Sequence, residues 1–202
     1  MNITDILKPI KLLKESHPNT GETGSGCLMN VVSYLNGDQE ITDRPACACP
    51  VVMPIAIWLN DYMNDDERQQ LLPFVERISG SRTYDVDVLT ARALVAARFE
   101  DVCAKSATKH AAKYAEYAKY AKYAESAKYA AKYSKYAKYD AKYARHAAES
   151  AAKHAAKYAA IRHELISAAL KCLDEMLPVQ SKPDDVVIER ARKLVEIANE
   201  PI

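Results

Sequence analysis

Apolar and polar residues alternate with helical rather than strand spacing along most of this chain. Apolar positions recur every three or four residues, which predicts amphipathic α-helices. The predicted helices are 27–35, 51–63, a third that follows Asn64 and ends before Gly80, and 181–197. Asn36-Gly37 predicts a left-handed C-terminal cap for the first helix, and Asn64 before Asp65-Asp66-Glu67 predicts an N-cap with an acidic first turn for the third. Pro73 is expected to kink that third helix.

The first 26 residues have a weaker pattern. A short apolar stretch from Ile3 to Ile10 is interrupted by Pro9, and a polar, glycine-bearing segment runs from His17 to Gly26. This composition predicts a loosely attached arm.

The longest segment without a helix breaker lies between Gly80 and Pro178, where neither glycine nor proline occurs. Strong helix formers without a breaker predict one long helix or two helices joined tightly. One apolar seam runs from Leu89 to Ala121 and another from Ala148 to Leu177, so the two halves are able to pack. A continuous helix over residues 85–177 would be roughly 140 Å long at 1.5 Å per residue.

The alternative to one continuous helix is a hairpin whose turn lies near Ser126, Ser134 or Asp140. The sequence pattern leaves both arrangements open. We therefore expect an all-α protein with a small helical head and a very long Ala/Lys/Tyr-rich helix, or a long helical hairpin. Its parts would be a helical module with a Cys-x-Cys loop (1–83), the low-complexity helix (84–178) and a short C-terminal helix packing on the head (179–202).

The net charge of +1 is the sum of two unlike parts of the 202-residue chain. Twelve Lys and two Arg face only four acidic residues between Lys105 and Arg162, a local net charge of +10. The remaining residues therefore carry −9, and a basic middle is flanked by acidic ends.

Units of Ala-Lys-Tyr recur within this basic middle, from about Ala111 to Ala160. Lysines neutralise phosphates and tyrosine rings stack on bases, so one interpretation is a nucleic-acid surface. The others are a solvated, alanine-stabilised helix produced by sequence expansion, or a surface for a protein or an anionic membrane. The candidate interaction residues are Lys113, Tyr114, Tyr117, Lys119, Tyr120, Lys122, Tyr123, Lys128, Tyr129, Lys132, Tyr133, Lys135, Tyr136, Lys138, Tyr139, Lys142 and Tyr143.

The five cysteines are an odd number at low density, so reduced thiols and a cytoplasmic location are expected. No segment has the apolar length of a signal-peptide core or a membrane span. Cys47 and Cys49 form a Cys-x-Cys pair, and with Cys27 and His17 they are weak candidates for a zinc site. This spacing matches no common zinc pattern, so small buried residues packing a loop are the competing interpretation.

Catalytic signatures do not emerge from the sequence. The segment from Gly21 to Gly26 has the composition of a phosphate loop but lacks the preceding strand and the following Lys-Ser/Thr. We expect a protein that is not an enzyme and needs no cofactor.

Several short blocks resemble a module in uncharacterised proteins of bacteria and their phages. These blocks are Cys27-Leu28-Met29, Asp43 to Val51, Leu59-Asn60-Asp61, Asp65 to Arg68, Leu71-Leu72-Pro73 and Gly80-Ser81-Arg82. In some of those proteins alanine-rich pseudo-repeats follow, with a closing segment similar to Leu170 to Leu177. Arg44 stands where such proteins often have His, which argues against a metal site at that position.

The resemblance implies a phage or prophage accessory protein and supplies no activity. We expect a non-enzymatic interaction or structural protein whose partner is a second copy or a host protein. A nucleic-acid-binding protein using the Lys/Tyr helix is the alternative.

Overall fold

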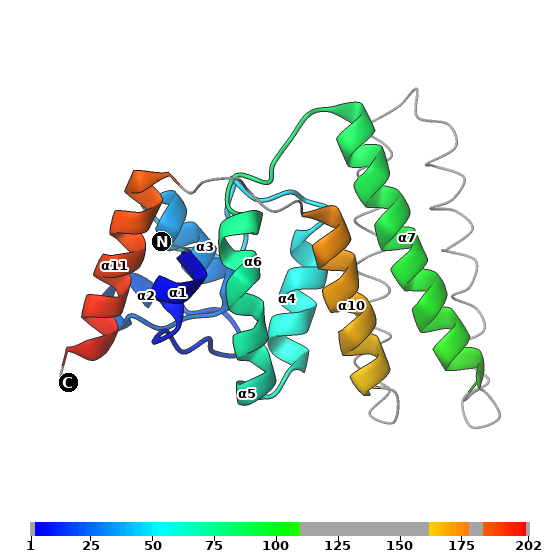
Figure 1. The fold of residues 1–202 in the computed structure, drawn as a ribbon, viewed down its shortest axis with the longest axis horizontal. Coiled ribbons are helices and arrows are strands. Elements are labelled where there is room, and N and C mark those ends of the chain that lie inside the picture. The colour runs from blue at the N-terminus through cyan, green and yellow to red at the C-terminus, as the bar shows by residue number, and fades with distance from the viewer. Residues whose placement is uncertain (1–2, 110–161, 178–183, 201–202) are drawn as a thin grey trace. The chain divides into compact units, whose positions relative to one another are not determined.

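The computed structural model describes residues 3–109, 162–177 and 184–200 (Figure 1). The described residues form helices and no named strand, as expected for an all-α protein. The elements are α1 (Ile3–Leu7), α2 (Thr20–Thr23), α3 (Leu28–Asn36), α4 (Met53–Tyr62), α5 (Asp65–Arg68), η1 (Gln69–Leu71), α6 (Leu72–Ile78), α7 (Val86–Lys109), α10 (Arg162–Met176) and α11 (Asp185–Asn199). Within these ranges no helix combines the length and the apolar character needed to cross a membrane.

The chain divides into two compact units. The first unit contains residues 1–49, 59–82 and 177–202, and the second contains residues 50–58 and 83–176. Each unit therefore combines segments that are distant in the sequence.

The N-terminal segment is an integral part of the first unit, so the prediction of a loosely attached arm was wrong. Ile3, Leu7 and Leu12 are completely buried, and α1 packs against α6 and α11. A backbone hydrogen bond of 2.9 Å from Leu13 N to Gly26 O ties the segment to the residues just before α3. Pro9 and the glycines suggested a loop, but the apolar side chains between them are buried by tertiary contacts that have no local signature.

Helix α3 begins and ends as the sequence predicted, with one unexpected cap. At its C-terminus Gly37 adopts a left-handed φ of 81° and donates to Ser33 O and Tyr34 O. At its N-terminus the cap is Cys27, whose sulfur accepts from Asn30 N. Nearly every residue of α3 is buried, so this helix is the centre of the first unit.

The segment after α4 is shorter and more broken than expected. Asn64 and Glu67 form a reciprocal capping box at the start of α5, which confirms the predicted N-cap. Instead of one kinked helix, α5 is followed by the 3-10 turn η1 and then by α6, which carries Pro73 in its first turn. Proline is tolerated there because the first amides of a helix have no intrahelical acceptor.

In the second unit α7 and α10 lie side by side and run antiparallel (Figure 1). The Nε atom of Arg92 donates to Met176 O at 3.0 Å, and further along α7 the sulfur of Cys172 lies 3.8 Å from Val95 O. Seam residues such as Ala93, Ala96, Ile166 and Leu173 are buried, in agreement with the predicted packing of the two halves. Because Arg92 and Met176 are in contact, residues 85–177 do not form one straight helix.

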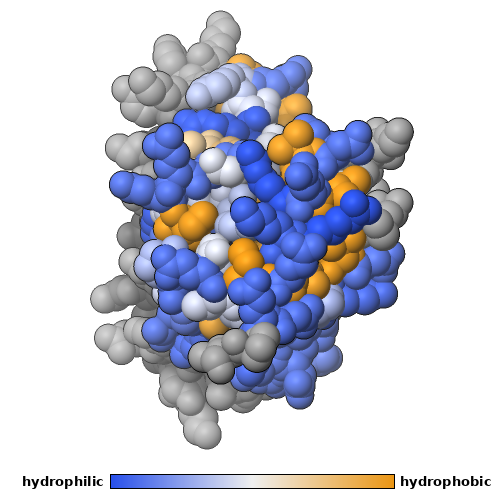
Figure 2. Space-filling model, turned by 90° about the vertical axis from the view of Figure 1, so that its left-hand side faces the viewer, coloured by the Kyte–Doolittle hydropathy of each residue, from blue (hydrophilic) through white to orange (hydrophobic). Residues whose placement is uncertain are grey.

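Helix α11 packs against α1, α2 and α3 within the first unit. Its N-cap is Asp184, and the Nη1 atom of Arg190 donates to Leu35 O at the end of α3 at 2.9 Å. Figure 2 shows that the surface on the side of α11 is mostly hydrophilic with apolar patches. Val186 of α11 is half exposed. Arg190 thus places a positive charge at the C-terminus of α3, where the last carbonyl groups lack intrahelical donors.

Two glycines with left-handed backbone allow a test of how tightly α11 is held. A Cβ at Gly24 would overlap the backbone of Ala198 in α11, whereas a Cβ at Gly80 would meet nothing. Gly24→Ala should lower the free energy of unfolding by about 3 kcal/mol, from backbone strain and overpacking, against about 1 kcal/mol for Gly80→Ala. Urea denaturation of both variants measures the difference, and equal losses would show that α11 yields easily.

Candidate functional site

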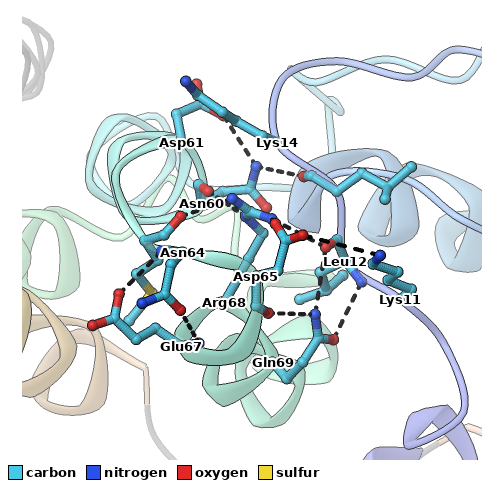
Figure 3. A network of polar contacts seen from close by, with 12 residues as sticks. Lys11, Leu12, Lys14, Asn60, Asp61, Asn64, Asp65, Glu67, Arg68 and Gln69 are labelled. Carbon is cyan, nitrogen blue, oxygen red and sulfur yellow. Dashed lines mark hydrogen bonds and ion pairs between the residues drawn. The ribbon is translucent and has the colours of Figure 1, made fainter.

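A group of polar contacts surrounds Arg68 in the first unit (Figure 3). The guanidinium is only 2% exposed. Its Nε donates to Asn60 O at 2.6 Å and its Nη2 to Met63 O at 2.7 Å. Its Nη1 donates to Asp65 Oδ1 at 2.7 Å and to Leu12 O at 3.4 Å. We call this set of contacts the Arg68 network.

Asn60 extends the Arg68 network toward the N-terminal segment and α3. Its Oδ1 accepts from Leu28 N at 3.0 Å, and its Nδ2 donates to Leu13 O at 2.9 Å. The side chain is buried, so each of these bonds satisfies a backbone group that water does not reach. Asn60 therefore fixes the start of α3 and the N-terminal segment to the same point of α4.

Asp65 is the only carboxylate that Arg68 contacts in the described residues. The hydrogen bond and the charge of Arg68 lower the pKa of the Asp65 carboxyl below its ordinary value. Asp65 is largely exposed and Arg68 is buried, so the pair joins a solvated acid to an interior cation. The main effect of such a pair is to satisfy the buried charge of Arg68. Its own net contribution to the free energy of unfolding is small.

The directions of these bonds decide what the Arg68 network does chemically. Every hydrogen bond drawn from the guanidinium goes to a backbone carbonyl or to Asp65 (Figure 3). Arginines that bind external anions point their donors at the ligand. The Arg68 network is therefore a structural lock that joins the N-terminal segment, α4 and α5.

Cys27 is held in an environment that suppresses thiol chemistry. The side chain is 4% exposed, and its sulfur donates to Asn30 Oδ1 at 2.9 Å. Burial raises the pKa of the thiol to about 11, with smaller contributions from Asp43 and Asp61. Since the thiolate is the nucleophile and the metal ligand, Cys27 acts as a helix cap.

His17 lies near Cys27 without forming a catalytic pair. Its backbone amide donates to Asn30 Oδ1 at 2.6 Å, while its ring Nε2 is 2.8 Å from Lys14 O. This hydrogen bond of the imidazole thus lies within its own loop.

The Cys47–Cys49 loop is clamped to the residues that follow α6. Arg82 N donates to Cys47 O at 2.8 Å, and Cys49 N donates to Ser81 Oγ at 2.9 Å. Cys49 is buried and Cys47 half-buried, and burial raises the pKa of the Cys47 thiol. Two blocks that carried the sequence resemblance, 43–51 and 80–82, therefore meet in the structure.

The structure does not bring Cys27, Cys47, Cys49 and His17 together as a zinc site. Among the described residues no group of three or more His, Cys, Asp or Glu side chains is placed to hold a metal ion. All five cysteines are free thiols.

A buried carboxyl in the second unit was not foreseen. Glu100 of α7 is 4% exposed, and among the described residues neither of its oxygens has a hydrogen-bond partner. Burial, with a smaller contribution from Asp101, raises the pKa of Glu100 to about 7. Such a group exchanges its proton near neutrality, where an exposed glutamate does not.

The Lys/Tyr candidates, Lys113 to Tyr143, lie outside the described residues, as do the proposed hairpin turn positions. The structure therefore leaves the predicted interaction surface as a prediction.

Sequence reasoning missed the residues that matter most in both units. Arg68 and Asn60 stood within blocks of the resemblance, but a buried arginine bound to backbone carbonyls leaves no motif. Glu100 follows Phe99 in an alanine-rich helix and has the spacing of an ordinary surface acid.

No protein-family model matches this chain, and neither the curated proteins nor the solved structures contain a significant match to it. The interpretation of its function therefore depends on the chain's own residues.

Replacing Arg68 tests the structural lock. Arg68→Lys keeps the charge but cannot reach the separate carbonyls of Leu12, Asn60 and Met63, so the free energy of unfolding should fall by about 3 kcal/mol. The matched control, Asp65→Asn, keeps an oxygen acceptor and should cost much less. Chemical denaturation of both variants decides the matter, and a larger loss in Asp65→Asn would mean that the exposed ion pair is the important bond.

Thiol alkylation tests the assignment of the cysteines. In the native protein iodoacetamide should modify Cys47 first, because Cys47 is half-buried whereas the other four cysteines are buried. Mass spectrometry after timed quenching gives the order, and all five thiols should react in denaturant. A Cys27 that reacts as fast as Cys47 would contradict the capping role.

Proposed function

We propose that this protein works by contacts with other proteins or with copies of itself, without catalysis. The chemically versatile side chains of the first unit are occupied in holding the fold: Arg68 and Asn60 bind backbone groups, and Cys27 caps α3. A partner would therefore bind through exposed side chains rather than through these groups.

The observation that carries this proposal is a group of exposed apolar side chains at the start of α7. Tyr84 is 81% exposed and Leu94 44% exposed, and Val86 and Val88 are also exposed. We call these four residues the α7 apolar group. Exposed aromatic and aliphatic side chains are candidates for contacts with another protein.

A long helical hairpin fits this proposal better than a single rod. Helices α7 and α10 run antiparallel and are in contact, so residues 85–177 do not form one straight helix. A hairpin presents a long side surface for self-association or for a host protein.

Nucleic-acid binding is the second candidate, and the local charge of +10 between Lys105 and Arg162 favours it. Phosphate neutralisation by lysine is strongly salt-dependent, whereas apolar packing between helices is not. The two candidates therefore give opposite responses to salt.

The setting we propose is the cytoplasm, in a phage or prophage context. Free thiols at all five cysteines suit a reducing compartment. The sequence resemblance to bacterial and phage proteins supports the second part of this proposal.

Light scattering coupled to size-exclusion chromatography tests the proposed function. The wild-type protein should form a defined oligomer whose mass is insensitive to salt, and the double variant Val88→Ser with Leu94→Ser should have a lower mass. Val186→Ser, which changes an exposed valine of α11, is the control and should leave the mass unchanged. A protein that is monomeric at all concentrations, with and without the double variant, contradicts self-association.

Runs with single-stranded and duplex DNA at two salt concentrations test the second candidate. Uptake of DNA at low salt that falls by orders of magnitude at raised salt would support it. In that case Lys→Gln changes across residues 113–142 should abolish the uptake. No uptake at either salt concentration removes the nucleic-acid interpretation.

A further inference from the structure

The carboxyl of Glu100 in the second unit lies among apolar neighbours, a feature that the proposed function does not require. The neighbours of Glu100 one turn away on α7 offer its carboxylate no strong donor: Ala96 and Ala97 precede it, and Cys103 follows it. All three are buried. On the preceding residue, the Phe99 ring lies 6.0 Å from the Trp58 ring, which makes this part of α7 an apolar interior.

The charged groups of α7 in the described residues do not neutralise Glu100. Arg92 donates to Met176 O, and Arg98 is paired with Glu175 at 2.7 Å. Asp101 carries the same charge as Glu100 and disfavours its ionisation further. Lys105 is exposed.

The groups contributed by the packing partners are equally unfavourable to an ionised Glu100. Helix α10 places Cys172 near Cys103, and its Lys171 is exposed and directed to Glu175. His163 and Glu164, at the start of α10, are exposed. The part of α4 in this unit, residues 53–58, has no titratable side chain. Within the described residues the carboxyl therefore has neither a cation nor a hydrogen-bond donor.

We propose that Glu100 makes the α7–α10 pair a proton-dependent element, packed tightly while the Glu100 carboxyl is neutral and loosened when it ionises. An ionised carboxylate in an apolar interior without partners is far more costly than a neutral carboxyl. The tightly packed arrangement of α7 and α10 thus binds the proton more strongly than the loosened arrangement does.

The pH range follows from the two states of the carboxyl. Its folded pKa of about 7 lies above the ordinary value of 4.5, so the folded state holds the proton between these values. The stabilisation is complete below the ordinary pKa and is lost as the pH rises through the folded pKa. A shift of this size changes the opening equilibrium constant on the order of a hundredfold.

Hydrogen exchange measured peptide by peptide tests the proposal, with the intrinsic pH dependence of exchange divided out. Between about pH 5.5 and about pH 8.5, protection of the α7 and α10 peptides in the wild-type protein should fall about thirtyfold, because about the first tenfold of the effect already develops below about pH 5.5. Peptides of α3 and α6 in the first unit report on the same sample and should change much less. In Glu100→Gln, which is neutral at every pH, the α7 and α10 protection should be independent of pH.

Glu164→Gln makes the same chemical change at an exposed position of α10 and should follow the wild-type protein. Equal pH dependence in wild type and Glu100→Gln would overturn the proposal. Should Glu100→Gln not fold, infrared difference spectroscopy of the wild-type protein decides instead. A protonated carboxyl band that is present at about pH 6 and lost by about pH 8 supports the proposal, and its absence at the lower pH refutes it.

Discussion

The first unit depends on the solvation of one cation by the protein's own backbone. Arg68 is buried, and its donors satisfy carbonyls at residues 12, 60 and 63, which belong to the N-terminal segment, to α4 and to the turn after α4. A buried guanidinium without these acceptors would be prohibitively costly, so the segments that provide them must be in place together. Asn60 adds the start of α3 to the same point.

The two units treat buried charge in opposite ways. In the first, Arg68 is surrounded by acceptors and remains a satisfied cation. In the second, Glu100 has no hydrogen-bond partner among the described residues, and burial raises its pKa so that it keeps its proton more readily than an exposed glutamate. The physical rule is the same, since a charge excluded from water must be paired, solvated by dipoles or neutralised.

The features that the sequence predicted correctly are those with local causes. The cap at Gly37 needs only a residue that tolerates positive φ, and the Asn64–Glu67 capping box lies within four residues. The seam spacing of α7 and α10 also indicated that they pack. Features with distant causes were not predictable: Leu12 and Arg68 are 56 positions apart, and the burial of Ile3 and Leu7 depends on α6 and α11. The candidate zinc ligands are likewise held by separate contacts, since Cys27 caps α3 and Cys47 O accepts from Arg82 N, 35 positions away.

The antiparallel pairing of α7 and α10 bears on how such a chain changes over generations. The two helices meet in a register fixed by contacts such as Arg92 with Met176, whatever length of chain joins them. The entropy cost of closing a connection grows slowly, by only about 0.6 kcal/mol for each doubling of its length. Duplication or loss of an Ala-Lys-Tyr unit in the chain between these helices should therefore leave the α7–α10 contacts intact, so slippage in the coding sequence should be tolerated.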